Sequence, residues 1–332
     1  MDLAASACEP GLCGTVATAD AVVAVGARTQ WQVGGPAPRD AVEVVAPAGV
    51  VHYEPDDLTI TVGGGTMFAE LSATLAQHGQ ECPLDPRTGD ATIGGVLACG
   101  LSGLRRLRLG PLRDHVLEVR FVTADGRLVK AGGPTVKNVT GYDLVRLLVG
   151  SLGTLGVLVQ ATLRCRPRPA SARWYEVDGR GAPADVFRPS CCLWDGATTR
   201  VLLEGAAADV DAQAHRLRAG DPPRLPEGPH RGRISVAPGT VDALAEALQR
   251  LDGVRWCAEL GIGTVHVAAA EATQLDDARA AAHDHGGWLL REAGGNPADD
   301  GFGRRLPSID LMRRIKAAFD PMGKLAPGRL PL

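Results

Sequence analysis

Residues 137–159 read KNVTGYDLVRLLVGSLGTLGVLV, and this stretch decides the fold class. It combines two glycine-bearing turns, a short amphipathic helix that ends near Val149, and an apolar strand over residues 157–163. In the second turn, residues 150–156, the glycines leave the backbone bare, so it can approach a flat ring or a phosphate closely. Glycines beside a strand also form tight corners and bulges. The pattern therefore favours a cofactor contact and a structural turn equally.

Two further glycine-rich turns lie upstream of this stretch. Residues 22–25 form an apolar strand that leads into a small-residue loop over residues 26–35, whose backbone amides can bind a diphosphate. Residues 58–62 alternate as a strand, glycines 63–65 break it, and an amphipathic helix follows. This strand, turn and helix resemble a dinucleotide-binding unit. Phe68, however, stands where the GxGxxG fingerprint requires its third glycine, so the fingerprint is not met.

A third, longer turn spans residues 83–103. Thr92 can cap a short helix whose first amides carry partial positive charge, which favours an anion. Arg113 and Asp114 then precede a strand over residues 116–122, and a hairpin returns the chain. Three glycine-rich turns and an Arg-Asp pair therefore precede the stretch quoted first, in a definite order.

Six segments, taken in chain order, carry a resemblance to a known family. They are VGARTQWQVGG, TVGGGTMFAELSATLAQHG, PLDPRTGDATIGGVLACGLSG, GPLRDHVLEVRFVTADGRLVKAGG, KNVTGYDLVRLLVGSLGTLGVLVQATLRCRPRP and DPMGKLAPGRL. In this order they resemble the flavoproteins of the vanillyl-alcohol oxidase and p-cresol methylhydroxylase (PCMH) superfamily, and within it the FAD-binding subunits of glycolate oxidases. The likeness covers residues 21–169 and returns at the C-terminus.

The resemblance implies an α+β fold with a definite division of the chain. Residues 1–169 would form a PCMH-type FAD-binding domain of two α/β subdomains, and residues 170–307 a small α+β cap that faces substrate or a partner. Residues 308–332 would form a C-terminal helix and tail that return to the FAD-binding domain. FAD would extend between the two subdomains, with its isoalloxazine ring at the edge of the cap.

The resemblance also assigns FAD contacts residue by residue. The loop at residues 26–30 and the helix start at residues 92–95 would hold the pyrophosphate, and three small residues beyond that helix start would line the flavin and ribityl region. Arg113 and Asp114 would order the adjacent turn, although they can also form a simple local ion pair. Residues 153–157 would pass near the adenine and ribose. The residues so assigned are Gly26, Ala27, Arg28, Thr29, Gln30, Thr92, Ile93, Gly94, Gly95, Ala98, Gly100, Gly103, Arg113, Asp114, Gly153, Thr154, Leu155, Gly156 and Val157.

The sequence departs from the family pattern at several places. Ala27 and Arg28 stand where the first loop of the family carries more glycine and often Ser or Asn, and Arg28 can compensate by pairing with phosphate. Ala326 replaces the Asn that normally precedes the last Pro-Gly, so a hydrogen bond near the flavin is expected to be missing. No His stands in the first loop where covalent members attach the flavin, which implies noncovalently bound FAD. Cys99 is interpreted as a small buried hydrophobe.

Composition agrees with a globular protein of about two domains. With 332 residues, 45% hydrophobic content and a formal net charge of −3, the chain is expected to be soluble and cytoplasmic, and to reach the inner face of the cell membrane only through partners. No basic stripe or nucleic-acid motif is present, so nucleic-acid binding is not expected. No apolar stretch of about 18 residues and no signal-peptide pattern occurs, so direct membrane insertion is not expected.

The eight cysteines contain no CxxCxxC run, so no iron–sulfur cluster is expected on this chain. Reduced, mostly buried thiols are the expectation for a cytoplasmic protein. His283 and His285 stand two residues apart at a predicted helix end and point in different directions, so no metal site is predicted. If electrons continue to iron and sulfur, a second polypeptide must carry the cluster.

The organisation of the chain changes after Pro169. The Arg-Pro alternation at residues 166–169 is predicted to break the strand and act as a linker, because proline cannot continue a central ladder. Beyond it, the pattern predicts a small antiparallel sheet with helices on one face. The strands are predicted at residues 191–194, 200–204, 233–236, 264–268 and 288–291, and the helices at residues 207–218, 241–251, 272–285 and 308–319.

Oxidation of a 2-hydroxy acid requires a flavin placed to accept hydride, a cation for the carboxylate and a base for the hydroxyl proton. His266 is the candidate for the base, because a strand can present it inward. The competing interpretation is a packed residue, which is the more common role of a single His on an alternating strand.

Three functions are compatible with these observations. The first is the FAD-binding subunit of a glycolate or related 2-hydroxy-acid oxidase or dehydrogenase, with a larger FAD-containing subunit and an iron–sulfur subunit as partners. It is favoured because the cap is short and no GDGNxH-like segment was found. The second is a stand-alone FAD oxidoreductase of a small hydroxy acid or alcohol. The third is a noncatalytic assembly module with weakened FAD binding, which Ala27 and Ala326 permit.

Overall fold

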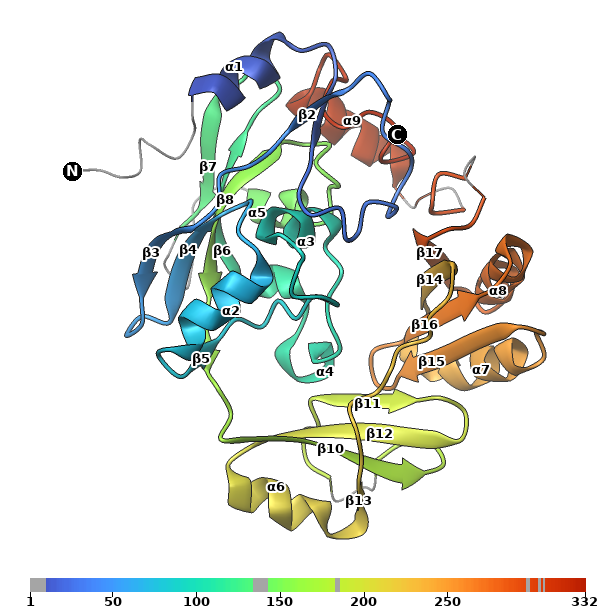
Figure 1. The fold of residues 1–332 in the computed structure, drawn as a ribbon. Helices are drawn as coiled ribbons and strands as arrows, with labels where there is room; N and C mark the ends of the chain where they lie inside the picture. Colours follow the sequence, from blue (N-terminus) through green and yellow to red (C-terminus); the bar gives the residue numbers. More distant parts are fainter. Residues whose placement is uncertain (1–9, 134–142, 183–185, 297–298, 304–305, 307) are drawn as a thin grey trace.

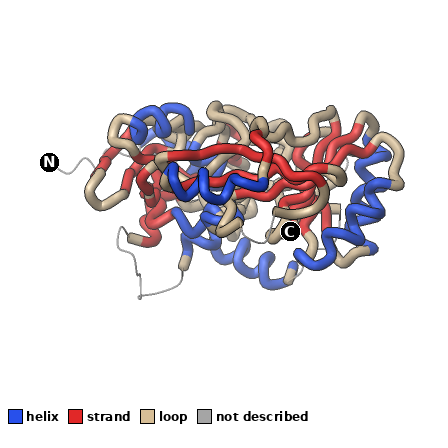
Figure 2. Tube along the Cα trace, turned by 90° about the horizontal axis from the view of Figure 1, so that it is seen from below, coloured by secondary structure: helices blue, strands red, loops and turns tan. Residues whose placement is uncertain are grey.

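The computed structural model describes residues 10–133, 143–182, 186–296, 299–303, 306 and 308–332. Residues 137–142 of the stretch quoted first lie outside this part. Two large antiparallel sheets organise the described chain, and helices pack against each of them (Figure 1). Seen from below, the molecule is elongated (Figure 2). No helix of the described part is long and apolar enough to cross a membrane.

The first sheet has five antiparallel strands. They are β3 (Val50–Glu54), β4 (Thr59–Gly63), β6 (Val116–Val122), β7 (Leu128–Gly132) and β8 (Val157–Arg164), and their order across the sheet is β3-β4-β8-β6-β7. The central strand β8 is almost wholly buried because its two faces enter different cores. Leu158 and Ala161 pack with helices on one side, and Val157 and Val159 pack on the other. The helices of the first core are α2 (Phe68–Ala76), α3 (Ile93–Cys99) and α5 (Leu144–Leu148).

The N-terminal and C-terminal segments meet beside this sheet (Figure 1). Helix α1 (Pro10–Thr18) precedes the parallel pair β1 (Val22–Ala24) and β2 (Val42–Val44). Helix α9 (Ile309–Phe319) leads into a tail that bridges β1: the Val22 amide donates to the Lys324 carbonyl at 2.8 Å, and the Ala326 amide donates to the Val22 carbonyl at 2.7 Å. The C-terminal tail therefore supports the strand that precedes the loop at residues 26–35.

The second sheet has eight strands, all paired antiparallel. Its strands are β10 (Ser171–Asp178), β11 (Cys191–Trp194), β12 (Thr198–Gly205), β13 (Arg218–Ala219), β14 (His230–Ser235), β15 (Val254–Glu259), β16 (Thr264–Ala269) and β17 (Trp288–Ala293). The helices between these strands are α6 (Ala207–Gln213), α7 (Val241–Gln249) and α8 (Ala272–Asp284). The order is β13-β10-β12-β11-β15-β16-β14-β17. Val210, Leu244 and Leu275, one from each helix, share one core with the strands. Leu202 and His266 belong to the opposite face, toward the first sheet.

The α+β class is confirmed, and the five strands and four helices predicted beyond Pro169 are present. Strands β10, β13 and β15 were not predicted. β15 reads VRWCAE. Its Arg255 and Glu259 interrupt the apolar pattern by which a strand is predicted, although four of its residues are buried. The predicted linker is also corrected: β9 (Arg166–Pro167) pairs with β5 (Gln80–Glu81), because proline is tolerated where the strand is only two residues long.

The expectation of reduced thiols is corrected at one position. Cys13 is disulfide-bonded, whereas Cys82, Cys99, Cys165, Cys191, Cys192 and Cys257 are free. Burial raises the pKa of Cys192 to about 11 and that of Cys165 to about 12, so these thiols are protonated and unreactive at neutral pH.

Candidate functional site

The start of α3 is the first predicted anion site. Thr92 caps the helix, and its side chain accepts a hydrogen bond from the Gly95 amide at 3.3 Å. The amides of Ile93 and Gly94 donate to backbone carbonyls at 2.9 and 2.7 Å. All three amides have acceptors within the protein, so a pyrophosphate at this helix start would have to compete with them, and the assignment of residues 92–95 to the pyrophosphate stays a prediction. Thr92 and Gly95 form the wall of a small cavity.

The loop at residues 26–30 offers the donors that α3 lacks. None of its five backbone amides donates a hydrogen bond within the described chain, and Gln30 Oε1 is buried there without a partner. Gly26 lies so close to α3 that a Cβ would stand 2.1 Å from Thr92 Oγ1. The loop borders the small cavity, of about 70 Å³, together with Ala98. Free amides beside small residues fit the pyrophosphate of a dinucleotide.

Arg28 is already paired. Its guanidinium bonds both carboxylate oxygens of Glu43 at 2.6 Å and lies 4.5 Å from the centre of the Trp31 ring. The Arg28 and Glu43 side chains are 45% and 52% exposed, so opening this pair costs at most about 1 kcal/mol. The predicted contact of Arg28 with phosphate therefore requires an exchange of partners that is energetically small.

The three small residues assigned to the flavin and ribityl region line different cavities. Ala98 borders the small cavity. Gly100 ends α3 with φ of 67°, and a Cβ there would stand 2.8 Å from Gly150 Cα. Gly103 borders the large cavity described below, and a Cβ there would stand 2.0 Å from the Asp85 carbonyl. Close approach of another backbone segment explains both glycines.

Two predicted groups border neither the small cavity nor the large cavity described below. Arg113 and Asp114 are exposed and lie 3.9 Å apart, and Asp114 pairs with a second arginine at 3.5 Å, which favours a local ion pair. Residues 153–157 pack against the C-terminal helix, where the Thr154 carbonyl accepts from Lys316 Nζ at 2.8 Å. A role of this segment near adenine stays a prediction.

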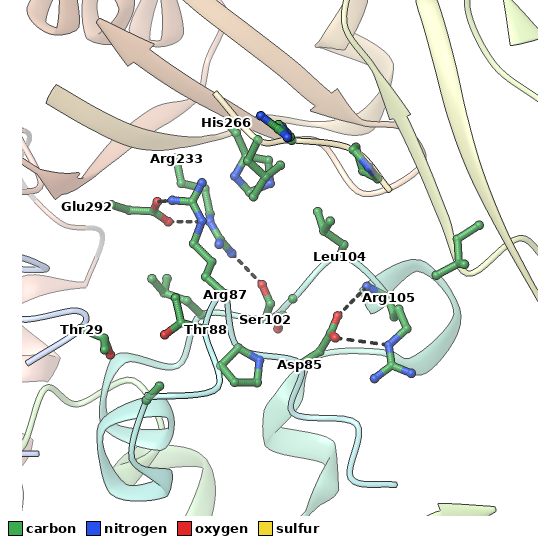
Figure 3. Close-up of a pocket in the computed structure, with 18 of the residues that line it drawn as sticks. Thr29, Asp85, Arg87, Thr88, Ser102, Leu104, Arg105, Arg233, His266 and Glu292 are labelled. Carbon is green, nitrogen blue, oxygen red and sulfur yellow. Dashed lines mark hydrogen bonds and ion pairs between the residues drawn. The ribbon is translucent and has the colours of Figure 1, made fainter. Parts of the chain in front are cut away.

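A large cavity of about 750 Å³ lies between the first part of the chain, which is the described chain up to Pro169, and the second sheet (Figure 3). Thr29 and Gln30 border both this large cavity and the small cavity. A ligand with its pyrophosphate on the loop at residues 26–30 would therefore extend from the small cavity into the large one. His266 of β16 borders the large cavity from the second sheet.

Charged side chains from both parts of the chain meet at one wall of the large cavity. Glu292 of β17 binds Arg87 at 2.7 Å and Arg233 of β14 at 3.0 Å, and Arg233 also donates to the Ser102 carbonyl at 2.8 Å (Figure 3). Burial alone would raise the pKa of Glu292, but Arg233 and Arg87 outweigh it and lower the pKa. Glu292 is therefore ionised and ties the two arginines together.

His266 lies on the same face of the second sheet, directly across from Arg233 on the neighbouring strand. Its Nε2 is 2.8 Å from Glu259 Oε1, and its Nδ1 is buried without a partner in the described chain. Burial lowers the pKa of His266, so the ring is neutral at neutral pH. A neutral imidazole held by a carboxylate can accept a proton. Among the described residues, no group of three or more side chains could hold a metal ion.

The buried His266 makes stability depend on pH. Its pKa in the folded protein lies below the ordinary histidine value of about 6.5, so its contribution is full above that pH and is lost as the pH falls through the folded pKa. We expect the free energy of unfolding, measured by urea titration, to fall from about pH 7 to about pH 5, and to fall less in His266→Gln. His115, whose pKa burial also lowers, titrates in both proteins. Equal pH slopes would contradict the assignment.

Sequence reasoning missed most charged residues of this wall, namely Arg87, Arg231, Arg233, Glu259 and Glu292. One signal was available: the strand HRGRIS places two arginines at alternate positions, and therefore on one face. Their pairing with residues of the first part could not be read from the sequence.

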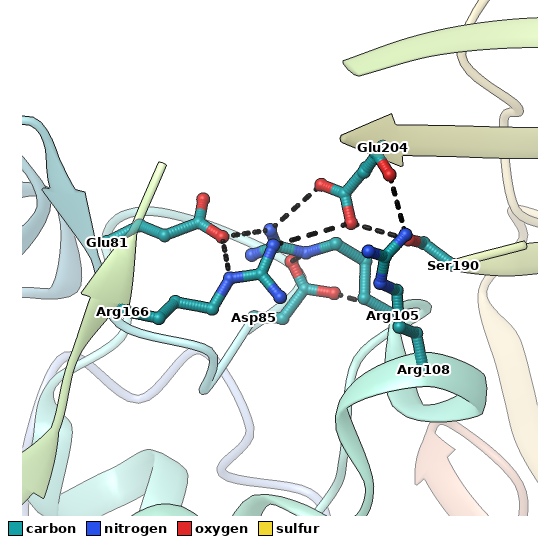
Figure 4. Close-up of polar contacts among 7 residues, drawn as sticks. All are labelled: Glu81, Asp85, Arg105, Arg108, Arg166, Ser190 and Glu204. Carbon is teal, nitrogen blue, oxygen red and sulfur yellow. Dashed lines mark hydrogen bonds and ion pairs between the residues drawn. The ribbon is translucent and has the colours of Figure 1, made fainter. Parts of the chain in front are cut away.

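A second polar cluster joins the two parts beside the large cavity (Figure 4). Helix α4 (Arg106–Leu109) follows Arg105, whose guanidinium contacts Glu81 at 2.9 Å, Asp85 at 3.3 Å and Glu204 at 3.3 Å. Arg166 of β9 contacts Glu81 at 2.7 Å and Glu204 at 3.7 Å. Glu204 belongs to β12 of the second sheet, so this cluster links that sheet to the first part.

Comparison with known proteins shows which protein family part of the sequence matches and which solved structures have a similar fold. Residues 15–132 match the FAD binding domain family. The whole fold is similar to that of alkyldihydroxyacetonephosphate synthase, with a TM-score of 0.67 and 15% identity over 97% of this chain and 75% of that one. The chain has a PCMH-type FAD-binding fold, and FAD is its cofactor.

Particular relatives narrow the resemblance. Glycolate oxidase subunit GlcE of Escherichia coli (strain K12) is 35% identical over 60% of this chain and 60% of its own length. D-lactate dehydrogenase of Archaeoglobus fulgidus is 39% identical over 36% of this chain and 27% of its own length. D-2-hydroxyglutarate dehydrogenase of Xanthomonas citri pv. viticola is 28% identical over 82% of this chain and 76% of its own length. The chain thus spans 60% of GlcE and 27% of the archaeal dehydrogenase.

Proposed function

We propose that this chain is the FAD-binding subunit of a glycolate or related 2-hydroxy-acid oxidase or dehydrogenase. The observation that carries the proposal is the large cavity, which shares Thr29 and Gln30 with the small cavity and also contains His266 and an arginine cluster. The similarity to GlcE and to D-lactate dehydrogenases supports the same class of substrate. Bound FAD supplies a two-electron acceptor.

The residues of this chain have distinct parts in the proposal. Free amides of the loop at residues 26–30 bind the pyrophosphate, with Thr92, Gly95 and Ala98 as the opposite wall. Gly103 borders the large cavity and allows the chain to pass close to Asp85, another residue of its wall. We also propose the division of the chain at residues 169 and 307, with the tail returning to the FAD-binding domain.

His266 would take the hydroxyl proton at Nδ1. Its Nε2 faces Glu259, which is 3% exposed and keeps the ring in one orientation. The lowered pKa leaves Nδ1 unprotonated at neutral pH, as a base requires. Arg87 and Arg233 add positive charge beside the site and favour an anionic hydroxy acid over a neutral alcohol.

Partners and location follow from the same resemblance. GlcE is by name a subunit, and glycolate oxidase subunit GlcD of Bacillus subtilis (strain 168) is 35% identical over 37% of this chain and 27% of its own length. We propose that the chain works with a larger FAD-containing subunit and an iron–sulfur subunit. It would be cytoplasmic and reach the inner face of the membrane through these partners.

One observation favours the noncatalytic assembly module as a second candidate. The amides at the start of α3 are used within the protein, and Arg28 is paired with Glu43. FAD would then depend on the loop at residues 26–30 for most of its anion contacts, and its affinity would be low.

An anaerobic titration tests the proposed function. The flavin-containing chain should lose its visible absorbance near 450 nm, on the order of one reduced flavin per chain, when glycolate or D-lactate is added without oxygen. A flavin spectrum that persists with both acids, alone and with the partner subunits present, would contradict the catalytic role. A colourless chain that still binds those partners would support the assembly module.

A further inference from the structure

The arginine cluster of the large cavity carries more positive charge than the protein neutralises. Arg87, Arg231 and Arg233 all border the cavity, and among the described residues Glu292 is the one carboxylate that forms ion pairs with any of them, although Glu227 also borders the cavity. Arg233 and Arg231 both act to lower the pKa of Arg87, after the larger effect of its burial, so the three guanidinium groups are close enough to repel one another. A small anion in the cavity would relieve this repulsion.

Arg231 is the member of the cluster without an anionic partner. Arg87 and Arg233 both bind Glu292, whereas no carboxylate of the described chain pairs with Arg231. Its Nε is buried and lacks a hydrogen-bond partner in the described chain. A buried N–H of a charged group without an acceptor is unfavourable, so the described chain leaves hydrogen-bonding capacity of this guanidinium unused at the cavity wall.

Strand geometry places Arg231 about two residues along the sheet from the candidate base His266. Arg231 and Arg233 stand at alternate positions of β14, so they share one face, and Arg233 is directly across from His266. Two residues along a strand span about 7 Å. The long Arg231 side chain can therefore reach an anionic group while the neighbouring carbon of the same small molecule lies near His266.

We propose that Arg231 is the substrate-specificity residue of the large cavity and binds the carboxylate of a small 2-hydroxy acid. A planar guanidinium matches a carboxylate with two parallel hydrogen bonds, which an alcohol or an aldehyde cannot provide. The inference rests on the proposed function, because it takes the large cavity as the substrate site. Beyond that function, it names Arg231 as the residue that makes the site prefer hydroxy acids to neutral alcohols.

Binding of oxalate to the flavin-containing chain tests this assignment without requiring turnover. Oxalate carries carboxylates but no hydroxyl-bearing carbon, so it cannot be oxidised in this way. We expect calorimetric titration to show about 10- to 100-fold weaker oxalate binding in Arg231→Gln and an intermediate loss in Arg231→Lys. Arg250→Gln removes the same charge at the exposed end of α7 and should bind like the wild type.

The outcomes separate this inference from the function on which it rests. Unchanged oxalate affinity in Arg231→Gln, with an unchanged flavin spectrum and melting temperature, would overturn the assignment, as would a wild-type chain that binds no oxalate. Oxalate binding that depends on Arg231, combined with no flavin reduction by hydroxy acids, would support the carboxylate site and refute the redox function. The conservative Arg231→Lys variant keeps the test valid if the glutamine variant fails to fold.

Discussion

Replacing Gly26 by alanine is expected to weaken FAD binding about 30- to 1,000-fold. The added Cβ would stand 2.1 Å from Thr92 Oγ1 and 3.1 Å from two other atoms of that side chain. Thr92 can rotate away only by giving up its cap on Gly95, a loss of about 1 kcal/mol, and by entering the small cavity. The alternative is for the loop to move off α3, which displaces the free amides. FAD titration of apoprotein, followed by flavin fluorescence, measures the change.

Gly14→Ala provides the matched control. Gly14 lies within α1, and nothing stands within 4 Å of the Cβ that alanine would add. FAD affinity should not change, and stability should rise by up to about 1 kcal/mol because alanine is the better helix former. Wild-type FAD affinity in Gly26→Ala would show that the pyrophosphate does not lie against this loop.

Glu204→Gln is expected to destabilise the protein by about 3 to 5 kcal/mol. The Glu204 side chain is 3% exposed and accepts from Ser190 at 2.6 Å and from Arg105 at 3.3 Å. The amide keeps the shape but removes the charge, so Arg105 and Arg166 would share only Glu81 and Asp85. Because this cluster links the second sheet to the first part (Figure 4), urea unfolding should also become less cooperative.

An exposed ion pair supplies the control for Glu204. Asp178 pairs with Arg218 at the edge of the second sheet, and their side chains are 85% and 64% exposed. Asp178→Asn should change the free energy of unfolding by less than about 0.5 kcal/mol, because water and salt screen such pairs. Similar small changes in Glu204→Gln and Asp178→Asn would mean that the cluster does not hold the two parts together.

Local patterns predicted the strands that carry continuous apolar runs. β6 and β8 coincide with predicted strands because both are buried and rich in branched residues. β10 and β15 were missed because charged and aromatic side chains interrupt their apolar pattern, and those side chains are accommodated only by pairing across the sheet. The disulfide of Cys13 was not predicted, because thiols of a protein expected to be cytoplasmic were expected to be reduced.

The site illustrates what a sequence leaves undetermined. Thr92 was predicted as a helix cap and is one, since capping depends on residues three apart. Whether the next amides are free depends on carbonyls of a distant turn, and those carbonyls occupy them. Likewise, Arg87 and Glu292 are separated by 205 positions, so their pairing exists only in the folded chain. His266 was found because a strand pattern could present it, whereas its partner Glu259 comes from the neighbouring strand.

We propose that this chain holds FAD, noncovalently, along the loop at residues 26–30. The most direct measurement is the flavin content of the purified chain before and after acid precipitation. We expect a yellow protein with on the order of one flavin per chain, all of it released as FAD into the supernatant, and a strongly reduced content in Gly26→Ala. A colourless chain that cannot be reconstituted with FAD, or flavin that stays with the precipitate, would contradict it.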